Sequence, residues 1–546
     1  MTRVAWKICW IIALSTPSPV LAEEAPDLLP TLEHKLSLEY RTQFVGMRPL
    51  SLNDLTADKI TYFDQRARIS SNFLIGKSVN IKSTIDLLDG VLFGDNGKFT
   101  GSPKRNRGSV VGAKGPNLSR LGIGQLNPET NALDIDNYGY VLEDADPVIV
   151  RAMYGEAITQ IGLFRAGRQP VTTGRNILVH DGSRINRWGI SKAPDVVDGI
   201  AFGTKLSAIM DIISGTEIDA SPNNGLFIAG LFGQIVENLP TVSDDLYQVA
   251  GTIFYKGQDV FLFGHEIPRF DSGIVATNRS QNAYQSEINN LTAYVIFETP
   301  SFLFSAFHTQ MIGTTREISE GLSLLGTRVG KPGPQDLAAF GGWVELAYRY
   351  KPVEFIFEIL YASGDDTPGV QDPINQLTFA QDTNVGLHLF ENVLSYQTAR
   401  SAALGVASLQ ALDAPTFPAN EVNTYGGLQN AIVFFPQIVY QPFPWLQGRI
   451  GAMFAFTQVP NVDPIATILR SSGSSIDDDK VNFNGGEPGD YWGTEIDLGI
   501  TIEPVKGFLI DLEGAYLFSG NAFWDEHEDA VDSVFANARL TYYYDD

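Results

Sequence analysis

The chain has 546 residues, of which 63 are acidic and 38 are basic, so its formal charge is −25. This balance argues against nucleic acid as a partner, because binding to phosphates needs a basic surface. A chain of this length usually forms several soluble domains, but no Pro/Ser-rich linker and no change of composition divides it. A large closed barrel is the common way to build one domain this long without a central core.

The N-terminus has the pattern of a secretory signal. Arg3 and Lys7 give a basic start, an apolar run follows over 8–14, and residues 20–22 supply a small-residue cleavage site. An uncleaved anchor helix is the alternative, and the short apolar run disfavours it. The sequence therefore predicts a signal peptide over 1–22, which is excluded from the fold.

The mature chain is expected to lack cysteine. The single cysteine is Cys9, inside the signal, and the residue after the cleavage site is Glu23. We therefore expect no disulfide, no cysteine-based metal site and no lipid attached to the new N-terminus. Loss of Arg3 and Lys7 with the signal leaves 36 basic against 63 acidic residues, a formal charge of −27.

Alternation of apolar and polar residues predicts β-strands along the first half of the chain. In the first of them, Leu38 and Tyr40 face opposite to Glu39 and Arg41. No period is evident between 206 and 224, where a short helix is expected. The strands predicted in this half are 35–44, 63–75, 79–89, 147–158, 163–169, 196–205, 226–235, 247–255 and 260–267.

The clearest hairpin lies over 342–366 and organises the second half. Leu346 and Phe355 belong to its apolar face, whereas Glu345 and Glu358 lie on the opposite, partly charged face. Each arm has about ten residues, enough for a tilted strand to cross a bilayer. The other strands predicted in this half are 287–298, 302–311, 430–440, 445–457, 491–503, 508–518 and 534–544.

The strands number about eighteen and are joined alternately by very short turns and by long loops. This asymmetry predicts an all-β fold, a transmembrane antiparallel β-barrel of about 18 strands with short periplasmic turns and long extracellular loops. The barrel is expected over 34–546 in the outer membrane of a Gram-negative bacterium, after a short periplasmic segment over 23–33. A soluble all-β assembly is the alternative, but it needs no aromatic girdle near the turns. The girdle residues are Phe297, Phe302, Tyr348, Tyr350, Tyr440, Trp445, Phe508, Tyr542 and Tyr544.

Four short motifs resemble those of the alginate-export family of outer-membrane barrels and its uncharacterised relatives. They are FRAGRQP at 164–170, YASGDD at 361–366, NA at 430–431 and GTEID at 493–497, and the resemblance covers most of 147–546. It implies an eighteen-stranded channel that passes a polysaccharide, with Arg165 and Glu495 in its constriction. The chain departs from the family in two respects. Its inward charges are balanced, which does not favour an anionic substrate, and it ends on Asp546 instead of an aromatic residue.

Charged residues at inward positions form the candidate site. Opposed rows of charge in a water-filled barrel create a transverse field that selects among polar solutes. Arg66 and Arg68 are singled out, because two like charges side by side on one strand are costly without a task or a partner. The alternative is that opposite charges neutralise one another and hold the wall. The predicted pore-lining residues are Arg41, Arg66, Arg68, Arg151, Arg165, Glu345, Arg349, Glu358, Arg449, Glu495, Asp497, Asp511 and Arg539.

Three long loops on the predicted extracellular side add further hypotheses. Segment 98–120 holds six basic residues and no acid, so it either binds lipopolysaccharide phosphates or an anionic ligand, or is a solvated loop. Segment 174–192 brings further basic residues, including Arg187, and is expected to fold into the lumen beside Arg165 and Arg168 as a constriction loop. Segment 364–422 is a candidate plug.

No catalytic residue, metal ligand or cofactor is predicted. Segment 134–139 begins like a calcium loop, but Tyr138 and Ala145 occupy positions where oxygen ligands are needed. The acidic run 477–479 is a solvated turn or a site for divalent cations that bridge lipopolysaccharide. The six histidines show no ligand spacing, and no GxSxG motif is present.

The sequence therefore predicts a channel and not an enzyme, which passes a polar solute or a polysaccharide chain passively. The expected partners are outer-membrane lipid and lipopolysaccharide, the solute, and the barrel-assembly machinery. Two rivals stay open. A barrel enzyme needs a Ser/His pair on the lipid-facing wall, where His308 is the candidate histidine. A structural or adhesive barrel would have an occluded lumen.

Overall fold

The computed structural model describes most of the chain. The described residues are 32–52, 60–76, 78–94, 146–171, 177–180, 186–190, 195–215, 224–235, 246–262, 265–282, 284–325, 331–367, 369, 371–380, 383–410, 422–471 and 477–545. The predicted signal peptide, nearly all of segment 23–33, the basic loop 98–120 and the calcium-like segment 134–139 lie outside them.

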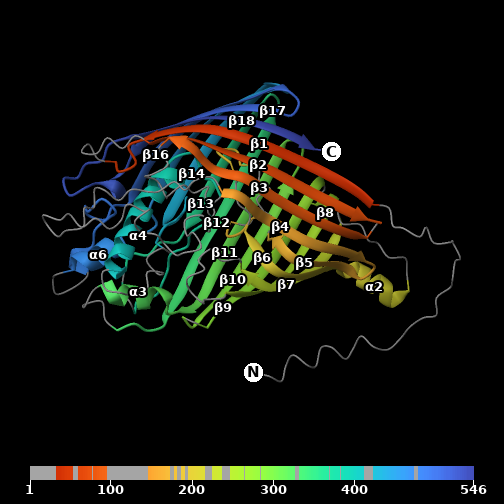
Figure 1. The fold of residues 1–546 in the computed structure, drawn as a ribbon, viewed down its shortest axis with the longest axis horizontal. Coiled ribbons are helices and arrows are strands. Elements are labelled where there is room, and N and C mark those ends of the chain that lie inside the picture. The colour runs from red at the N-terminus through yellow and green to blue at the C-terminus, as the bar shows by residue number, and fades with distance from the viewer. Residues whose placement is uncertain are drawn as a thin grey trace.

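Eighteen antiparallel strands form one closed sheet. Each strand pairs with the next along the chain, and β1 pairs with β18 as well as with β2, which closes the barrel. The prediction of eighteen strands is confirmed (Figure 1). The strands are β1 (Leu32–Arg48), β2 (Ile60–Ile75), β3 (Val79–Gly94), β4 (Asp146–Thr159), β5 (Gly162–Pro170), β6 (Val196–Lys205), β7 (Gly225–Ile235), β8 (Tyr247–Leu262), β9 (His265–Gln281), β10 (Ser286–Glu298), β11 (Phe302–Thr315), β12 (Gln335–Tyr350), β13 (Val353–Ala362), β14 (Ala431–Phe443), β15 (Leu446–Phe456), β16 (Tyr491–Val505), β17 (Phe508–Ser519) and β18 (Ser533–Asp545).

Side chains alternate between a covered inner face and an open outer face. In β12, Trp343, Glu345 and Ala347 are buried, whereas Tyr348 and Tyr350 are exposed. Because successive side chains of a strand point to opposite sides of the sheet, one alternating sequence supplies both faces. The hairpin predicted over 342–366 is confirmed, with Glu345 paired to Glu358 across β12 and β13.

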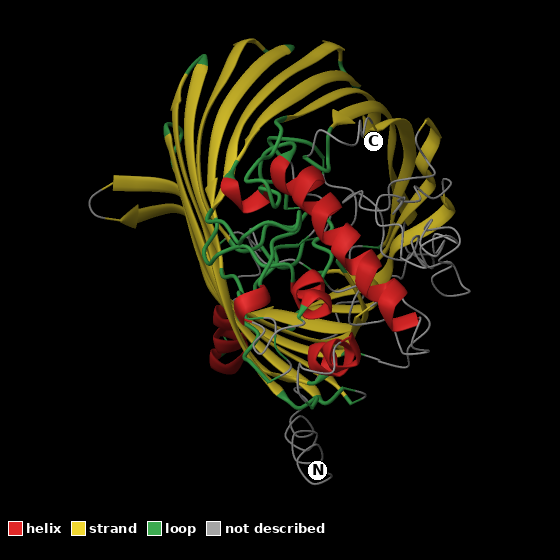
Figure 2. Ribbon diagram, turned by 90° about the vertical axis from the view of Figure 1, so that its left-hand side faces the viewer, coloured by secondary structure: helices red, strands yellow, loops and turns green. Residues whose placement is uncertain are grey.

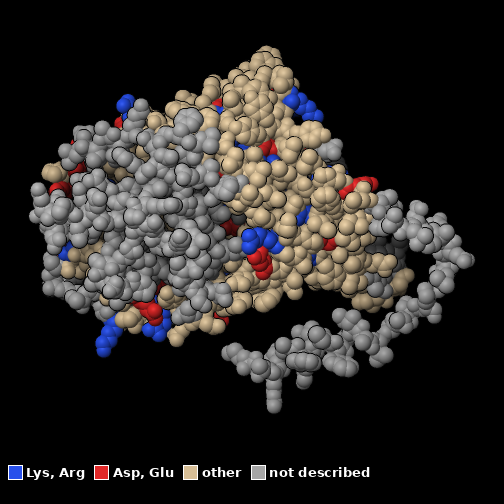
Figure 3. All heavy atoms as spheres, viewed as in Figure 1, with Lys and Arg blue, Asp and Glu red and all other residues tan. Residues whose placement is uncertain are grey.

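The outer face is mainly apolar. Where the outer wall is seen in Figure 3, charged side chains are sparse among uncharged ones. Aromatic residues are exposed on this face next to the short turns, as the predicted girdle requires. They include Tyr348, Tyr350, Tyr440, Phe443, Trp445, Tyr542 and Tyr544.

The two ends of the barrel differ in their connections. At one end, which we call the short-turn end, most neighbouring strands are joined by two or three residues, and β1 begins and β18 ends there. At the other, the long-loop end, most connections are long and carry α3 (Glu317–Leu325), α4 (Ser395–Gln410) and α6 (Pro464–Arg470) (Figure 1). The predicted asymmetry is therefore confirmed.

Two connections break this rule. Residues 282–285 join β9 to β10 by a short turn at the long-loop end, and the connection 206–224 at the short-turn end contains the expected short helix, α2 (Leu206–Ser214). The remaining helical turns are η2 (Leu389–Leu394), η3 (Asp477–Asp479) and η4 (Asn521–Phe523). Among the described residues, no helix is long and apolar enough to cross a membrane.

The predicted position of the ninth strand is wrong. The sequence placed a turn at 256–259 and a strand over 260–267, but β8 continues through these residues and β9 runs over His265–Gln281. Gly257 and Asp259 suggested a turn, yet Gly257 pairs with Phe270 in the ladder and Asp259 adopts a positive φ within the strand. Such a local irregularity bends a strand without ending it.

Substitution of Leu498 by arginine tests whether the outer face meets hydrocarbon. Leu498 lies near the middle of β16 and is 54% exposed on the outer face. We expect Leu498→Arg to lower the free energy of unfolding in lipid vesicles by about 2–4 kcal/mol, as arginine does at a bilayer midplane. Val505→Arg, at the short-turn end of the same strand, is the control and should cost about 0–1 kcal/mol. Equal effects measured in denaturant titrations would place this wall outside the hydrocarbon.

Candidate functional site

The inner wall over β1 to β4 carries a chain of ion pairs. Arg66 Nη2 lies 2.5 Å from Glu39 Oε1, Arg68 Nε donates to Asp86 Oδ1 at 2.6 Å, and Arg151 Nε donates to Asp86 Oδ2 at 2.7 Å. Each arginine singled out on β2 therefore has an acidic partner on a neighbouring strand. Such pairs are what the alternative of mutual neutralisation expects, and the filter role of Arg66 and Arg68 stays a prediction.

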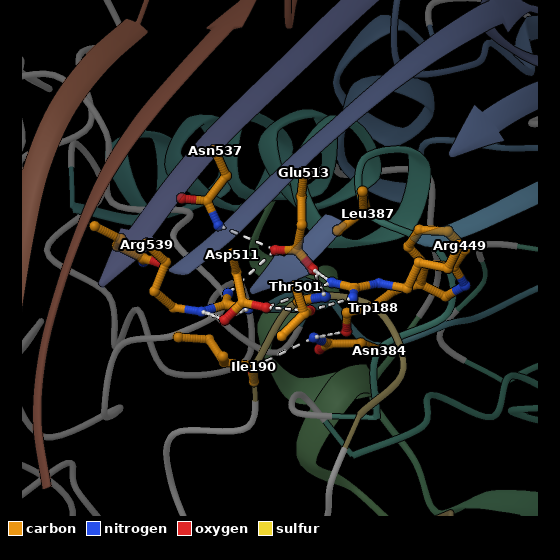
Figure 4. A network of polar contacts seen from close by, with 12 residues as sticks. Trp188, Ile190, Asn384, Leu387, Arg449, Thr501, Asp511, Glu513, Asn537 and Arg539 are labelled. Atoms are coloured by element: carbon orange, nitrogen blue, oxygen red, sulfur yellow. Dashed lines mark hydrogen bonds and ion pairs between the residues drawn. The ribbon is translucent and has the colours of Figure 1, made fainter. Parts of the chain in front are cut away.

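A second network joins β15, β17 and β18 (Figure 4). Glu513 accepts hydrogen bonds from Arg449 Nη2 at 2.7 Å and from Arg539 Nη1 at 3.1 Å, and Asp511 lies 3.2 Å from Arg539. Arg449 also donates to Thr501 at 2.7 Å. All four charged side chains are buried, so pairing compensates the loss of their hydration.

Residues 186–190, from the connection between β5 and β6, lie against the adjoining inner wall of β12 to β14. Arg187 donates to Glu345 at 2.8 Å, to Glu358 at 2.9 Å and to Gln437 at 3.3 Å. Three strands, β12 to β14, thus hold one guanidinium. Folding of this connection into the lumen was predicted, but Arg187 does not lie beside Arg165 and Arg168 as expected. Charge explains the difference, because the acidic pair offers it partners.

Trp188 fixes the same connection in place. Its Nε1 donates to Gln437 at 2.9 Å, its ring stacks on Phe435 with centroids 6.2 Å apart, and the Arg449 guanidinium lies 5.5 Å from its ring centroid. Asn384 Nδ2 then donates to the Trp188 carbonyl at 3.0 Å (Figure 4). The tryptophan therefore connects the wall to the segment between β13 and β14.

That segment, over 363–430, is anchored to the wall by Glu495. The carboxylate accepts hydrogen bonds from three consecutive backbone N–H groups, those of Leu387 at 2.8 Å, His388 at 2.9 Å and Leu389 at 2.5 Å. N–H groups at the start of a helical turn such as η2 have no backbone partner within the helix, so a negative charge placed there is favourable. Gly386, with φ +71°, permits the approach, since a Cβ there would lie 2.8 Å from Glu495 Oε1.

His388 is a buried, neutral anchor in the same segment. Its Nε2 lies 2.7 Å from Ser533 Oγ on β18. Burial without a charged partner lowers the pKa of His388 to about 3. The imidazole therefore remains uncharged under ordinary conditions.

The interior at the long-loop end contains a hydrophobic core of its own. Gln397 on α4 donates to the Leu50 carbonyl at 2.9 Å, and Arg400 donates to the Phe483 carbonyl at 2.5 Å. Figure 2 shows the longest helix and several loops within the outline of the barrel. The described part of segment 364–422 therefore lies inside the barrel, where Phe379 and Phe390 join a core that also includes Trp188, Phe435, Trp492 and Phe523, and whether it plugs the lumen stays a prediction.

Other inward charges are partly exposed. On β3 to β5, Lys82 Nζ lies 2.8 Å and Arg165 Nε 2.6 Å from Glu156, and the side chains of Lys82 and Arg165 are 34% and 33% exposed. Arg349, paired with Glu298 and Glu354 at 2.9 Å each, is also 33% exposed. These side chains face the interior and are about one third open there.

All thirteen predicted pore-lining residues lie at inward positions, but most are covered. Ten of them are buried by ion pairs or by the inserted segments. Only Arg68, Arg165 and Arg349 are partly exposed, and whether these residues line a pore stays a prediction. The predicted set left out Lys82, although the predicted strand 79–89 places it inward, and the sequence analysis missed Glu156, Arg269 with Asp271, and Glu298. Their alternation with outward apolar residues was the available signal.

Arg168 and His308 lie on the outer face. Arg168 donates two hydrogen bonds to Asp198, at 2.9 and 2.8 Å. It follows Arg165 by three residues on the same strand, and this odd spacing puts the two side chains on opposite faces of the sheet. His308 is exposed, and its cross-strand partners are Ala293 and Gly342, which carry no nucleophile. In the part of the chain that the structure describes, no three His, Asp or Glu side chains gather as a metal site.

The closed sheet with an apolar outer face and a charged, partly wet inner face defines the class: an outer-membrane β-barrel. No protein-family model and no curated protein matches the sequence.

Among solved structures, the chain is similar to Pseudomonas aeruginosa OccK9 (OpdG), with a TM-score of 0.47 and 10% identity over 94% of this chain and 98% of that one. It is also similar to P. aeruginosa OccK2 (OpdF), with a TM-score of 0.46 and 11% identity over 94% and 98%, and to Acinetobacter baumannii OccAB4, with 0.46 and 10% over 95% and 99%. The fold assignment rests on the strand pairing of this chain.

Replacing Glu495 by glutamine tests the anchor of the inserted segment. Loss of the charge weakens three hydrogen bonds to backbone donors, so the amides of Leu387, His388 and Leu389 should exchange about a hundredfold faster with solvent. Hydrogen exchange read by mass spectrometry checks this. Glu503→Gln, at the short-turn end of β16, is the matched control and should leave these amides protected. Unchanged exchange in Glu495→Gln would show that the core alone holds the segment.

The depressed pKa of His388 predicts acid sensitivity of the same segment. The unfolded state binds a proton below about pH 6.5, whereas the docked histidine resists protonation until about pH 3. Docking should therefore be strongest above pH 6.5 and weaken steadily as the pH falls toward 3. Protease susceptibility of the segment, measured across this range, should lose part of its pH dependence in His388→Gln. An identical profile in the variant would assign the acid sensitivity to other groups.

Proposed function

We propose that this protein is a passive outer-membrane channel for small polar solutes. The observation that carries the proposal is the partial exposure of inward charges such as Lys82, Arg165 and Arg349, each about one third open to water although it faces the barrel interior. An aqueous bore behind an apolar outer wall is what passage of polar solutes requires. Insertion into the membrane would use the barrel-assembly machinery.

The wetted charges favour solutes without a large net charge. Arg165 and Lys82 share Glu156, and Arg349 lies between Glu298 and Glu354, so each exposed cation stands beside an acid. Such pairs present a transverse field of both signs in place of a uniformly positive surface. A neutral or zwitterionic polar solute suits this wall better than a polyanion.

The inserted segments favour a small solute over a polymer. Arg187 and Trp188 occupy the interior in front of β12 to β14, and the segment anchored by Glu495 lies against β16 and β18. A polysaccharide chain would need an unobstructed path along the whole barrel. The export of alginate-like polymers, which the sequence motifs suggested, therefore stands as the second choice of substrate.

A structural or adhesive barrel with an occluded lumen is the alternative function. The observation in its favour is the hydrophobic core inside the barrel, in which Trp492, Phe390 and Phe523 are almost fully buried. A barrel whose interior is packed in this way gains rigidity whether or not it conducts.

Ion selectivity in a planar bilayer tests the channel. Arg165→Gln removes a wetted luminal cation, so the ratio of anion to cation permeability should fall while a stable conductance remains. Arg168→Gln is a closely matched control, since it removes the same charge three residues away on the outer face and should leave selectivity unchanged.

Two results would contradict the proposal. Absence of any conductance from correctly folded protein, also after deletion of residues 387–410, would support the structural alternative. Equal shifts of selectivity in Arg165→Gln and Arg168→Gln would show that the inner face does not line the conducting path.

A further inference from the structure

A hollow of about 390 Å³ opens on the outer wall across β8 to β11. Side chains from the outer face surround it, including Asn278, Asn289, Leu291, Gln310 and Ile312, and Gly251 leaves the space between them. Its volume lies in the range of small-molecule sites. Leu291 and Ile312 are each 52% exposed, so the hollow is open to whatever surrounds the barrel.

The polar groups of this hollow are amides. Asn278 pairs with Asn289 across β9 and β10, and Asn278 Nδ2 donates to Asn289 Oδ1 at 3.0 Å. Each amide has further capacity, an acceptor on Asn278 and donors on Asn289, that this contact does not use. Gln310, on β11 opposite Leu291, adds a third amide. Hydrocarbon cannot satisfy these groups, and leaving them unpaired in it is costly.

The amides lie at the level where the outer face changes from apolar to polar residues. Asn278 is three residues before the end of β9 and Asn289 three residues after the start of β10, about 10 Å of strand from the long-loop end. The outward pair nearer that end is Ser280 with Glu287, whereas the outward pair farther inside is Ala276 with Leu291. The hollow therefore spans the boundary between polar and apolar surroundings.

The surrounding charges distinguish between occupants. Glu287 and Asp336 are exposed at outward positions toward the long-loop end, so a bare phosphate would meet like charge. A second copy of the barrel would bring a convex wall or an identical hollow, and two hollows do not fill each other. A neutral headgroup with hydroxyl or amide groups matches the three amides, and its acyl chain matches Leu291 and Ile312.

We propose that this hollow binds the neutral, hydroxyl- or amide-bearing headgroup of an outer-leaflet glycolipid. Asn278 and Asn289 hold the headgroup by hydrogen bonds, Gln310 extends the polar side, and the acyl chain lies over Leu291 and Ile312. The site rests on the membrane placement of the barrel and not on conduction, so its variants should keep wild-type conductance.

Native mass spectrometry of protein purified in a sugar-free detergent tests the site. The probes are a glycolipid with a neutral disaccharide headgroup and phosphatidylglycerol, added in equal amounts. The double variant Asn278→Leu/Asn289→Leu should retain about tenfold less glycolipid, as expected for two hydrogen bonds of the strength found within membranes. Ala276→Leu, which fills the hollow and keeps both asparagines, should give a similar loss. Thr42→Leu on the outer face of β1 is the control.

Three outcomes would overturn the proposal. Equal glycolipid retention by wild type and both variants would show adventitious binding only. Preferential retention of phosphatidylglycerol at this site would contradict the neutral headgroup. A change of oligomeric state in the variants, without a change in lipid, would assign the hollow to contact between copies of the chain.

Discussion

The structure depends on complete pairing of the backbone around the sheet. A strand surrounded by hydrocarbon has no water to satisfy its N–H and C=O groups, so an open edge is excluded. Pairing of β1 with β18 over Ser37–Asp545 to Arg48–Val534 removes both edges. Once the sheet is closed, the alternation of each strand fixes which side chains meet lipid and which face the interior. The two-sided wall is a consequence of that closure.

Closure also creates the electrostatic problem that the inner wall solves. Arginines and carboxylates brought to one face cannot all reach water, because ordered segments cover part of it. Asp86 between Arg68 and Arg151, and Glu513 between Arg449 and Arg539, distribute one acid over two cations. Such shared pairs cost less than separate buried charges. The charges that remain partly exposed, near Glu156 and Arg349, form their ion pairs with other residues of the barrel wall.

The alternation of apolar and polar residues and the residue types at the turns made the barrel predictable. The side-chain contacts between residues far apart in the sequence could not be predicted in this way. Alternation placed Glu345 and Glu358 on one face because side-chain direction is local. The partner of that pair, Arg187, is 158 residues from Glu345, and no local pattern identifies it. The error at β9 has a different origin, since Gly257 and Asp259 have turn-forming propensities that the sheet overrides. Arg168 was grouped with Arg165 because both belong to the motif at 164–170. The alternation of side chains along the strand places Arg168 on the outer face.

The interior is asymmetric, and that asymmetry links the fold to the proposed passage. Arg187, Trp188 and the segment anchored by Glu495 all contact the wall formed by β12 to β18, through bonds to Glu345, Gln437 and Ser533. The partly exposed pairs at Glu156 lie on β3 to β5, close to the tight turns that join β2 to β3 and β4 to β5 at the short-turn end. Widening the interior beside β12 to β18 would require breaking buried hydrogen bonds. The inward cations Lys82 and Arg165, on β3 and β5, are already partly exposed. Under the proposed channel function, we therefore expect the solute path to follow β3 to β5, with the Glu495 anchor limiting its width.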